Sequence, residues 1–269
     1  MSTAPRPTKA ARRDEARAAA LRLREEQQSA ARRQRTVAVA ALVAGLAVVA
    51  VVVAVILGQG SSSPLDEVTA PAGATASGGI PVGADGVAGT TSGSAEDATA
   101  VDVYSDFMCP VCSVFEEVSG PTLDEYRERG DVVVEYHLVS ILDRYAQGSE
   151  YSTRAANAAA VVADQAPEAF LAFMTALFTD QPAENTPGLT DDEIADRAIT
   201  AGVPEAVAET FADGRFTEWV VAATDQASKD LGQLRTPTIL IDGQNLGTDL
   251  QVDWRVEGAL AEAIEAARG

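Results

Sequence analysis

Two cysteines, the only two in this chain of 269 residues, stand in a Cys-x-x-Cys spacing at Cys109 and Cys112. The alternating apolar segment 99–105 before them predicts a strand, and the apolar spacing after them predicts a helix. This order places the first sulfur at a helix N-terminus, where free N–H groups and the helix dipole favour a thiolate. Pro110 suits the first helical position, which needs no N–H donor. The spacing therefore predicts two thiols that close reversibly into a disulfide.

Three kinds of site compete for these cysteines. A zinc or iron–sulfur site needs four ligands, and besides the pair the chain offers only one histidine, His137. A purely structural disulfide across so short a loop would constrain the unfolded chain little. We therefore expect a dithiol–disulfide redox centre with no metal ion and no cofactor. A pair that oxidises without further function stays an alternative.

An uncharged run of 21 residues, 37–57, is the next constraint, because as a helix it spans roughly the 30 Å hydrocarbon core of a bilayer. The segment 1–36 before it carries ten basic and four acidic residues. The positive-inside rule predicts a cytoplasmic basic N-terminal segment 1–36, a transmembrane helix 37–57 and an extracytoplasmic remainder, as in a single-pass cell-membrane protein. A cleaved signal peptide is the alternative, but its charged N-terminal region and its apolar core are usually shorter than the segments 1–36 and 37–57.

Residues 58–98 are dominated by Gly, Ser, Ala, Thr and Pro. Such a segment buries too little apolar surface to offset the entropy lost on ordering, so we expect a flexible extracytoplasmic linker. Within it, residues 79–82 and the turn after them suit a short edge strand. The basic segment carries +6 of a total charge of −20, which leaves an acidic remainder and argues against a nucleic-acid partner.

Residues 99–269 are predicted to form one globular domain. The sequence indicates, in order, a strand at 99–105, a helix at 110–129 with a break near Gly120-Pro121, a strand at 132–139, helices across about 150–231, a strand at 238–241, a hairpin turn and a helix at 252–268. Two strands joined by a helix are typical of a parallel pair. The expected fold class is α/β with an inserted helical subdomain.

Thr236-Pro237 stands directly before the last predicted strand. Proline lacks the N–H that a strand ladder uses, and the bond before it adopts the cis form at low cost. A cis-proline loop beside the two cysteines would present the backbone of Thr236 to an extended peptide. An ordinary proline at the start of a strand stays the alternative.

Residues 104–112 (Tyr-Ser-Asp-Phe-Met-Cys-Pro-Val-Cys), with Phe115-Glu116 after them and Thr236-Pro237-Thr238 further on, resemble the DsbA-like branch of the thioredoxin superfamily. Within that branch the chain is similar to the membrane-anchored thiol–disulfide oxidoreductases of bacteria. The resemblance covers roughly residues 80–268. It implies a thioredoxin-like fold in which a helical insertion separates the second strand from the third.

The resemblance also implies roles for individual residues. Cys109 would be the exposed nucleophile, Cys112 the buried resolving cysteine, and Thr236-Pro237 a cis-proline substrate loop that faces them. Strongly oxidising members often carry a histidine between the cysteines, where this chain has Val111, so the pKa of Cys109 should be lowered less. Asp106 is either a turn residue at the end of a strand or a group that tunes Cys112 or moves a proton.

These features predict a membrane-tethered, extracytoplasmic oxidoreductase that introduces disulfides into exported proteins. The resemblance suggests an integral-membrane, quinone-linked oxidase as the partner that recycles it. A reductase or isomerase of the same fold is the main alternative, because the sequence does not set the reduction potential. A peptide-binding module without catalysis is a further alternative. For His137, on the strand 132–139, we expect a structural role, since a thiolate nucleophile needs no base.

Overall fold

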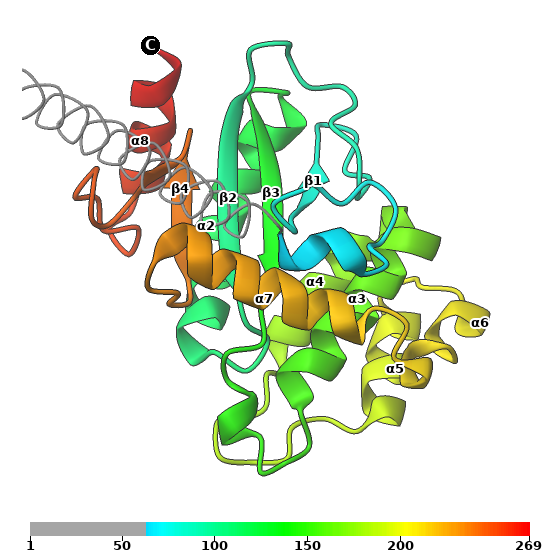
Figure 1. The fold of residues 1–269 in the computed structure, drawn as a ribbon. Helices are drawn as coiled ribbons and strands as arrows, with labels where there is room; N and C mark the ends of the chain where they lie inside the picture. The colour runs from blue at the N-terminus through cyan, green and yellow to red at the C-terminus, as the bar shows by residue number, and fades with distance from the viewer. Residues whose placement is uncertain (1–62) are drawn as a thin grey trace, which may run out of the picture. The chain divides into compact units, whose positions relative to one another are not determined.

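A five-stranded sheet runs through residues 63–269, the part of the chain that the computed structural model describes (Figure 1). In spatial order its strands are β1 (Ile80–Val82), β3 (Val132–Leu138), β2 (Thr99–Ser105), β4 (Thr238–Ile241) and β5 (Gln244–Asn245). β2 and β3 are parallel and α2 (Pro110–Glu128) joins them, so the predicted parallel pair is confirmed. The other neighbouring strands are antiparallel.

The predicted basic segment 1–36 and transmembrane helix 37–57 lie outside the described residues. Within residues 63–269, no helix combines the length and the apolar character that crossing a membrane requires. The two N-terminal assignments therefore stay predictions.

Helices cover both faces of the sheet. Successive residues of a strand point to opposite faces, and here Val103 joins the main core with Phe115 of α2. Tyr104, its neighbour, packs instead with Ala227 of α7 (Thr217–Leu231), the helix that crosses the near face of the sheet in Figure 1. With both faces covered, the loop that follows β2 lies at the carboxyl ends of the parallel pair, where a site can form.

The helix α2 runs through Gly120 and Pro121 without a break, so the predicted interruption is wrong. A proline inside a helix removes one hydrogen bond and costs about 3 kcal/mol. Phe115 precedes Pro121, and Leu123 and Tyr126 follow it on the same buried face. Burial of large side chains on both sides of the proline offsets that cost, and the helix continues.

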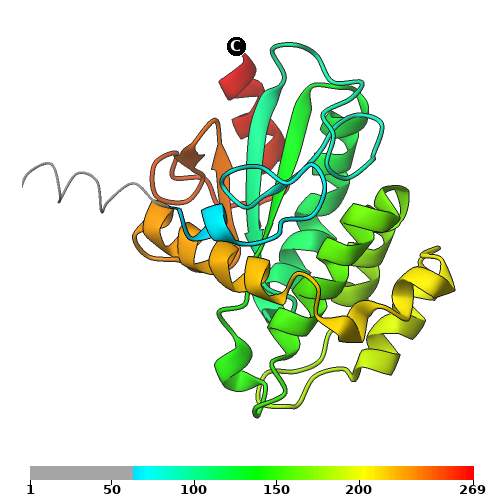
Figure 2. The same ribbon diagram turned by 45° about the vertical axis from the view of Figure 1, so that its right-hand side comes forward.

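The helical insert lies between β3 and β4 and gathers beside the lower end of the sheet in Figure 2. Its helices are α3 (Tyr151–Gln165), α4 (Phe170–Thr179), α5 (Asp191–Thr200), α6 (Glu205–Ala208) and α7. Short 3-10 turns occur at Pro64–Glu67, Asp143–Tyr145, Pro167–Ala169 and Phe211–Asp213. A capping box opens α5: Glu193 N–H donates to Thr190 Oγ1 at 3.2 Å, and Thr190 N–H donates back to the Glu193 carboxylate at 2.7 Å.

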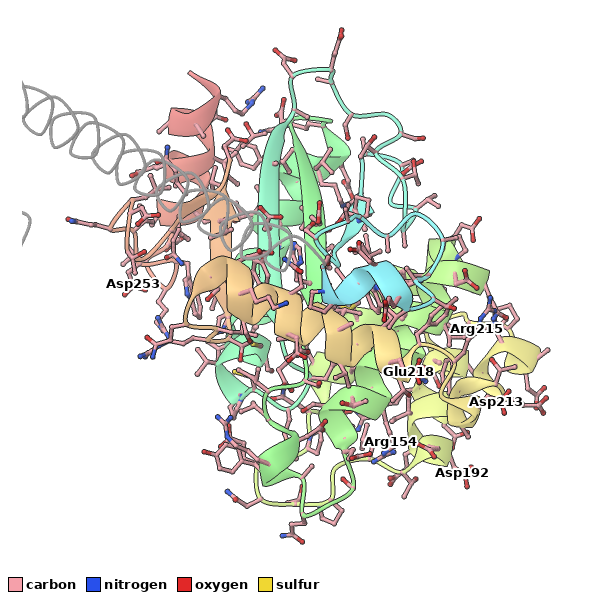
Figure 3. All side chains as sticks on the ribbon, viewed as in Figure 1. Arg154, Asp192, Asp213, Arg215, Glu218 and Asp253 are labelled. Carbon is pink, nitrogen blue, oxygen red and sulfur yellow. The ribbon has the colours of Figure 1, made fainter. Side chains whose placement is uncertain are left out.

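The outer surface of the insert is acidic. Asp192, Asp213 and Glu218 are exposed there (Figure 3). Arg154 pairs with Asp191 at 2.6 Å, so this arginine adds little free positive charge. The surface agrees with the acidic composition of the chain.

The last helix is shorter than the sequence predicts. α8 spans Ala259–Arg268, whereas the apolar spacing indicated a helix from residue 252. Gly258 has a left-handed backbone (φ +79°) and separates α8 from the preceding segment. Trp254, in that segment, is buried edge-on against Phe115 at 5.2 Å between ring centroids. Trp254 is thus buried although its segment is a loop. The spacing of apolar residues alone does not distinguish such a loop from a helix.

Residues 63–98 form an ordered N-terminal arm on the sheet, so the prediction of a flexible linker at 58–98 is wrong for this part. Ile80 and Val82 are fully buried, and β1 pairs antiparallel with β3 at the edge of the sheet. The predicted short edge strand at 79–82 is therefore confirmed. Pro81 fits this place because an edge strand tolerates a residue without a donor.

Two side chains outside the N-terminal arm, Glu135 and Arg127, hold it by hydrogen bonds. The hydroxyl groups of Thr75 and Ser77 donate to Glu135 Oε1 at 2.6 and 2.8 Å. The buried Arg127 donates from Nη1 to Gly83 O at 3.2 Å. The linker prediction considered only the segment's own apolar content. It missed these contacts because their partners lie 40 to 60 residues away in the chain.

Candidate active site

The site is built on the junction of β2 with α2, which we call the cysteine loop (residues 106–112). Cys109 is the N-cap residue of α2, with extended backbone angles (φ −81°, ψ 113°), and Pro110 opens the helix. This geometry directs the free N–H groups of the first helical turn toward the Cys109 sulfur. The predicted placement of the first sulfur at a helix N-terminus is confirmed.

The surroundings of Cys109 favour its thiolate. The Cys109 thiol lies 3.4 Å from Thr236 O, to which it donates. A hydrogen bond from the Cys112 thiol lowers the pKa of Cys109 to about 6. Partial burial opposes this shift, and the Thr236 side chain and the N–H groups of Cys112 and Val111 add to it. A thiol with that pKa is largely ionised at neutral pH, which is the reactive form.

Cys112 has the opposite character. Burial, the hydrogen bond with Cys109 and the charge of Cys109 raise the pKa of Cys112 well above its usual range. Cys112 is 1 % exposed and Cys109 is 5 % exposed, so the expected exposed nucleophile is in fact largely covered. Both residues are free thiols in this structure. The pair thus combines one acidic thiol with one that holds its proton.

The loop before β4 comes to the same place. The Thr236–Pro237 peptide bond is cis, and the Thr236 carbonyl faces the Cys109 sulfur although 127 residues separate them. Thr238, the first residue of β4, pairs with Tyr104 near the end of β2. The sheet therefore brings the loop and the two cysteines together, as the resemblance implied.

Asp106 organises the cysteine loop from within. Its fully buried carboxylate accepts hydrogen bonds from Met108 N–H at 2.9 Å, Leu142 N–H at 2.9 Å and Ser152 Oγ at 2.6 Å. Burial raises the pKa of Asp106 to about 7 despite these three donors. The contacts favour the turn-residue interpretation, because all three fix backbone or α3 rather than a sulfur atom.

Val111, between the cysteines, is 38 % exposed. Its side chain therefore stands at the surface, where a histidine would also fit. Val114 and Val118 follow it at 44 % and 45 % exposure on the same side of α2. These three valines form an exposed apolar stripe that begins inside the Cys-x-x-Cys motif.

The helical insert supplies contacts that the sequence did not reveal. Gln181, directly after α4, donates from Nε2 to Phe107 O at 2.9 Å and to Cys109 O at 3.0 Å. Ser113 Oγ donates to Phe178 O at 3.1 Å. A lone glutamine in a polar loop carries no motif, and only the packing of the insert beside α2 shows its role.

His137 lies in a separate cluster on β3. Its ring stacks on Tyr104 (centroids 4.0 Å apart), and its Nε2 lies 3.1 Å from Asp102 Oδ1 and 3.3 Å from Glu135 Oε1. These three potential ligand atoms lie within 4.8 Å of one another, close enough to surround a cation. Glu135 Oε1 already accepts two hydroxyl donors of the N-terminal arm, so the contacts agree with the structural role expected for His137.

Comparisons with known proteins agree with this geometry. The sequence profile of the family described as Thioredoxin matches residues 87–258. The structure of the reduced disulfide bond oxidoreductase DsbG from Mycobacterium tuberculosis is 32 % identical, with a TM-score of 0.59 over 73 % of this chain and 90 % of that chain. Reduced DsbA from the same organism is 31 % identical, with a TM-score of 0.58 over 71 % of this chain and 92 % of that one.

A further relative is longer than this chain. The serine/threonine-protein kinase PknE of Mycobacterium tuberculosis is 35 % identical over 120 residues, which are 43 % of this chain and 21 % of the kinase. The chain thus spans about a fifth of the length of the curated relatives that it matches. Together with the sheet order and the helical insert, the matches confirm an α/β thioredoxin-like fold with an inserted helical subdomain. The chain belongs to the DsbA-like thiol–disulfide oxidoreductases of the thioredoxin superfamily.

Proposed function

We propose that this protein is a membrane-tethered, extracytoplasmic oxidoreductase that introduces disulfides into exported proteins through Cys109 and Cys112. One observation carries the proposal: the two thiols, three residues apart, have pKa values shifted in opposite directions. An acidic thiol is a good leaving group and a poor partner for a disulfide, so Cys109 favours the reduced form of the pair. A pair that prefers to be reduced oxidises its substrates.

The reaction proceeds in two exchanges. A thiolate of the reduced substrate attacks the Cys109 sulfur of the Cys109–Cys112 disulfide, a mixed disulfide forms, and Cys112 leaves and takes up a proton. A second substrate thiolate attacks the substrate sulfur of the mixed disulfide and expels Cys109 as a thiolate. Two electrons pass from the substrate dithiol to the cysteine pair, and the substrate keeps the new disulfide.

The other residues of the site support these exchanges. Thr236 presents its carbonyl 3.4 Å from the Cys109 sulfur, where the backbone of an extended substrate segment can pair with the loop. Pro110 and Val111 set the first turn of α2, and Asp106 holds the loop through its three hydrogen bonds. The apolar stripe of Val111, Val114 and Val118 offers a surface for apolar side chains of an unfolded substrate.

The sequence supports the proposed location, and the family resemblance supports the proposed recycling partner. Residues 37–57 would tether the domain outside the membrane, where disulfides form and persist. The reduced pair needs an electron acceptor after each turnover. An integral-membrane, quinone-linked oxidase suits a tethered domain, because both would stay in the plane of the same membrane.

Two measurements on the full-length chain test the direction of the chemistry. Its reduction potential should lie well above that of thioredoxin, about −270 mV, and it should form disulfides in reduced, unfolded ribonuclease. A potential near −270 mV with efficient reduction of insulin would instead establish a reductase. Binding of unfolded ribonuclease with no exchange, and with no loss on Cys109→Ser, would establish a peptide-binding module.

A further inference from the structure

Gln181 contacts the cysteine loop although it belongs to the helical insert. It follows the last turn of α4 after Asp180, and its amide nitrogen reaches two loop carbonyls, those of Phe107 and Cys109, at 2.9 and 3.0 Å. The carboxamide nitrogen carries two hydrogens, so it can serve both acceptors at once. One side chain thereby brackets Met108 and fixes the backbone directly before α2.

The two carbonyls depend on this donor to different degrees. Cys109 O also accepts the Cys112 and Ser113 N–H groups, at 3.0 and 3.3 Å. Phe107 O has no other donor within residues 63–269, and Phe107 is buried. A buried carbonyl without a partner is unfavourable, so loss of Gln181 would let the Phe107 peptide turn toward another donor.

We propose that Gln181 is a positioning residue of the exchange reaction: its amide holds the backbone on both sides of Met108, so that the Cys109 sulfur stays at the N-terminus of α2 opposite Thr236. The inference rests on the proposed function in one respect, that Cys109 is the sulfur that exchanges with the substrate. Gln181 also acts electrostatically, because an N–H donated to the Cys109 carbonyl reduces the negative potential next to a thiolate.

Neighbouring contacts fix Gln181 itself in place. Ser113 of α2 donates to Phe178 O in the last turn of α4, three residues before Gln181. The rings of Phe107 and Phe178 lie 5.0 Å apart. The end of α4 is therefore packed against the cysteine loop, and the amide of Gln181 needs little ordering to reach its two acceptors.

The segment after Gln181 offers a matched control. Gln147 donates from Nε2 to Asn185 O, a backbone carbonyl of the same segment. Gln147→Ala removes the same chemical group and one contact of the same segment, but it leaves the carbonyls of the cysteine loop untouched. Any general loosening of the segment would appear in both alanine variants.

The test is the thiolate titration of Cys109 in the reduced full-length chain, followed by absorbance at 240 nm and by the pH dependence of alkylation. Gln181→Ala should raise the titration midpoint by about 0.5 to 1 pH unit, the equivalent of one ordinary hydrogen bond. Gln181→Glu should raise it further, because a carboxylate would stand beside two carbonyls and a thiolate. Gln147→Ala should leave it unchanged.

An unchanged midpoint in Gln181→Ala would overturn the inference, and so would an equal shift in Gln147→Ala. The titration reports on Cys109 directly and does not depend on the direction of catalysis. A chain that lacks ribonuclease oxidation but shows the shift would overturn the proposed function and leave the role of Gln181 standing. Normal oxidation of ribonuclease with an unchanged Cys109 midpoint in Gln181→Ala would support the proposed function and overturn the role of Gln181.

Discussion

The cysteine loop and the N-terminal arm are fixed by different kinds of interaction. In the cysteine loop, the groups that set the two thiol pKa values directly lie almost all within six residues of one another, with Thr236 as the distant exception. Gln181 contributes through its hydrogen bonds to the loop backbone. The N-terminal arm is fixed by groups far away in the chain, Glu135 and Arg127. The chemistry of the loop is therefore local, whereas the order of the arm is a property of the whole fold.

This difference predicts that the two regions respond differently to substitution. Changes at Cys109 and Val111 should alter thiol titration, potential and turnover while the free energy of unfolding changes little. Changes at the contacts of the N-terminal arm should lower the free energy of unfolding and leave the thiols unaffected. Four substitutions, each with a matched variant, test this separation in the chain of 269 residues.

The largest effect is expected at Cys109 itself. Cys109→Ser should abolish disulfide exchange, a loss of at least about 1,000-fold, because a serine hydroxyl neither attacks a disulfide nor leaves one. Oxidation of reduced ribonuclease measures it. Cys112→Ser is the partner experiment: it lacks the Cys109–Cys112 disulfide and should also fail to oxidise reduced ribonuclease. Its Cys109 thiolate should still attack a substrate that already holds a disulfide, and because Cys112 is missing, the mixed disulfide should accumulate as a covalent adduct on non-reducing gels. Residual turnover in Cys109→Ser would mean that another group carries the reaction.

Arg127 tests the opposite region. Arg127→Met removes a buried donor to Gly83 O and leaves Asp124 without its partner, so the free energy of unfolding should fall by about 2–3 kcal/mol. Urea denaturation measures the loss. Arg129→Met is the matched control, because the ion pairs of Arg129 on the same helix end are exposed, and its loss should be much smaller.

The midpoint of the Cys109 titration should stay the same in both arginine variants. A shifted Cys109 midpoint in Arg127→Met would show that the N-terminal arm and the cysteine loop are coupled. The thiol pKa values would then depend on distant contacts as well as on the loop.

The same contrast explains how much the sequence revealed. Local patterns gave the strand 99–105, the parallel pair and the N-cap position of Cys109, because alternation and a proline at the first helical position act over a few residues. Thr236 was found because proline before a strand is a strong local constraint. These elements form the centre of the fold and of the site.

Distant packing decided the rest. The helix α2 continues through Pro121 because buried side chains lie on both sides of the proline. In the loop before α8, Trp254 packs against Phe115 of α2. Gln181 escaped notice for the same reason: its partners are carbonyls of a loop more than 70 residues away. No pattern within these segments encodes such partners.

Asp106 gives an intermediate effect that depends on pH. Because burial raises its pKa to about 7, the folded protein keeps a proton that the unfolded chain releases near pH 4. The stability from this group is complete below about pH 4 and is lost as the pH rises through about 7, with a slope of at most about 1.4 kcal/mol per pH unit. Urea denaturation of the oxidised protein measures it, since oxidation removes the opposite contribution of Cys109.

Asp106→Asn should flatten this dependence between pH 6.5 and 7.5. Glu116→Gln is the control: burial raises the pKa of Glu116 to about 6, so its removal should flatten the dependence at lower pH and leave the upper part intact. An unchanged slope in Asp106→Asn would show that Asp106 is already ionised in the folded protein. The carboxylate would then hold the cysteine loop as a charged acceptor.

The smallest and most specific change is Val111→His. The side chain is 38 % exposed, so a histidine fits without repacking, and its ring N–H or positive charge would stand beside the Cys109 thiolate. We expect the pKa of Cys109 to fall below its present value of about 6 and the reduction potential to rise, by about 30 mV for each tenfold gain in thiolate stability. Val114→His, one turn further along the same exposed stripe, should change neither. If both variants raise the reduction potential equally, the added positive charge acts regardless of its position. The local groups in the first turn of α2 would then not be what sets the pKa of Cys109.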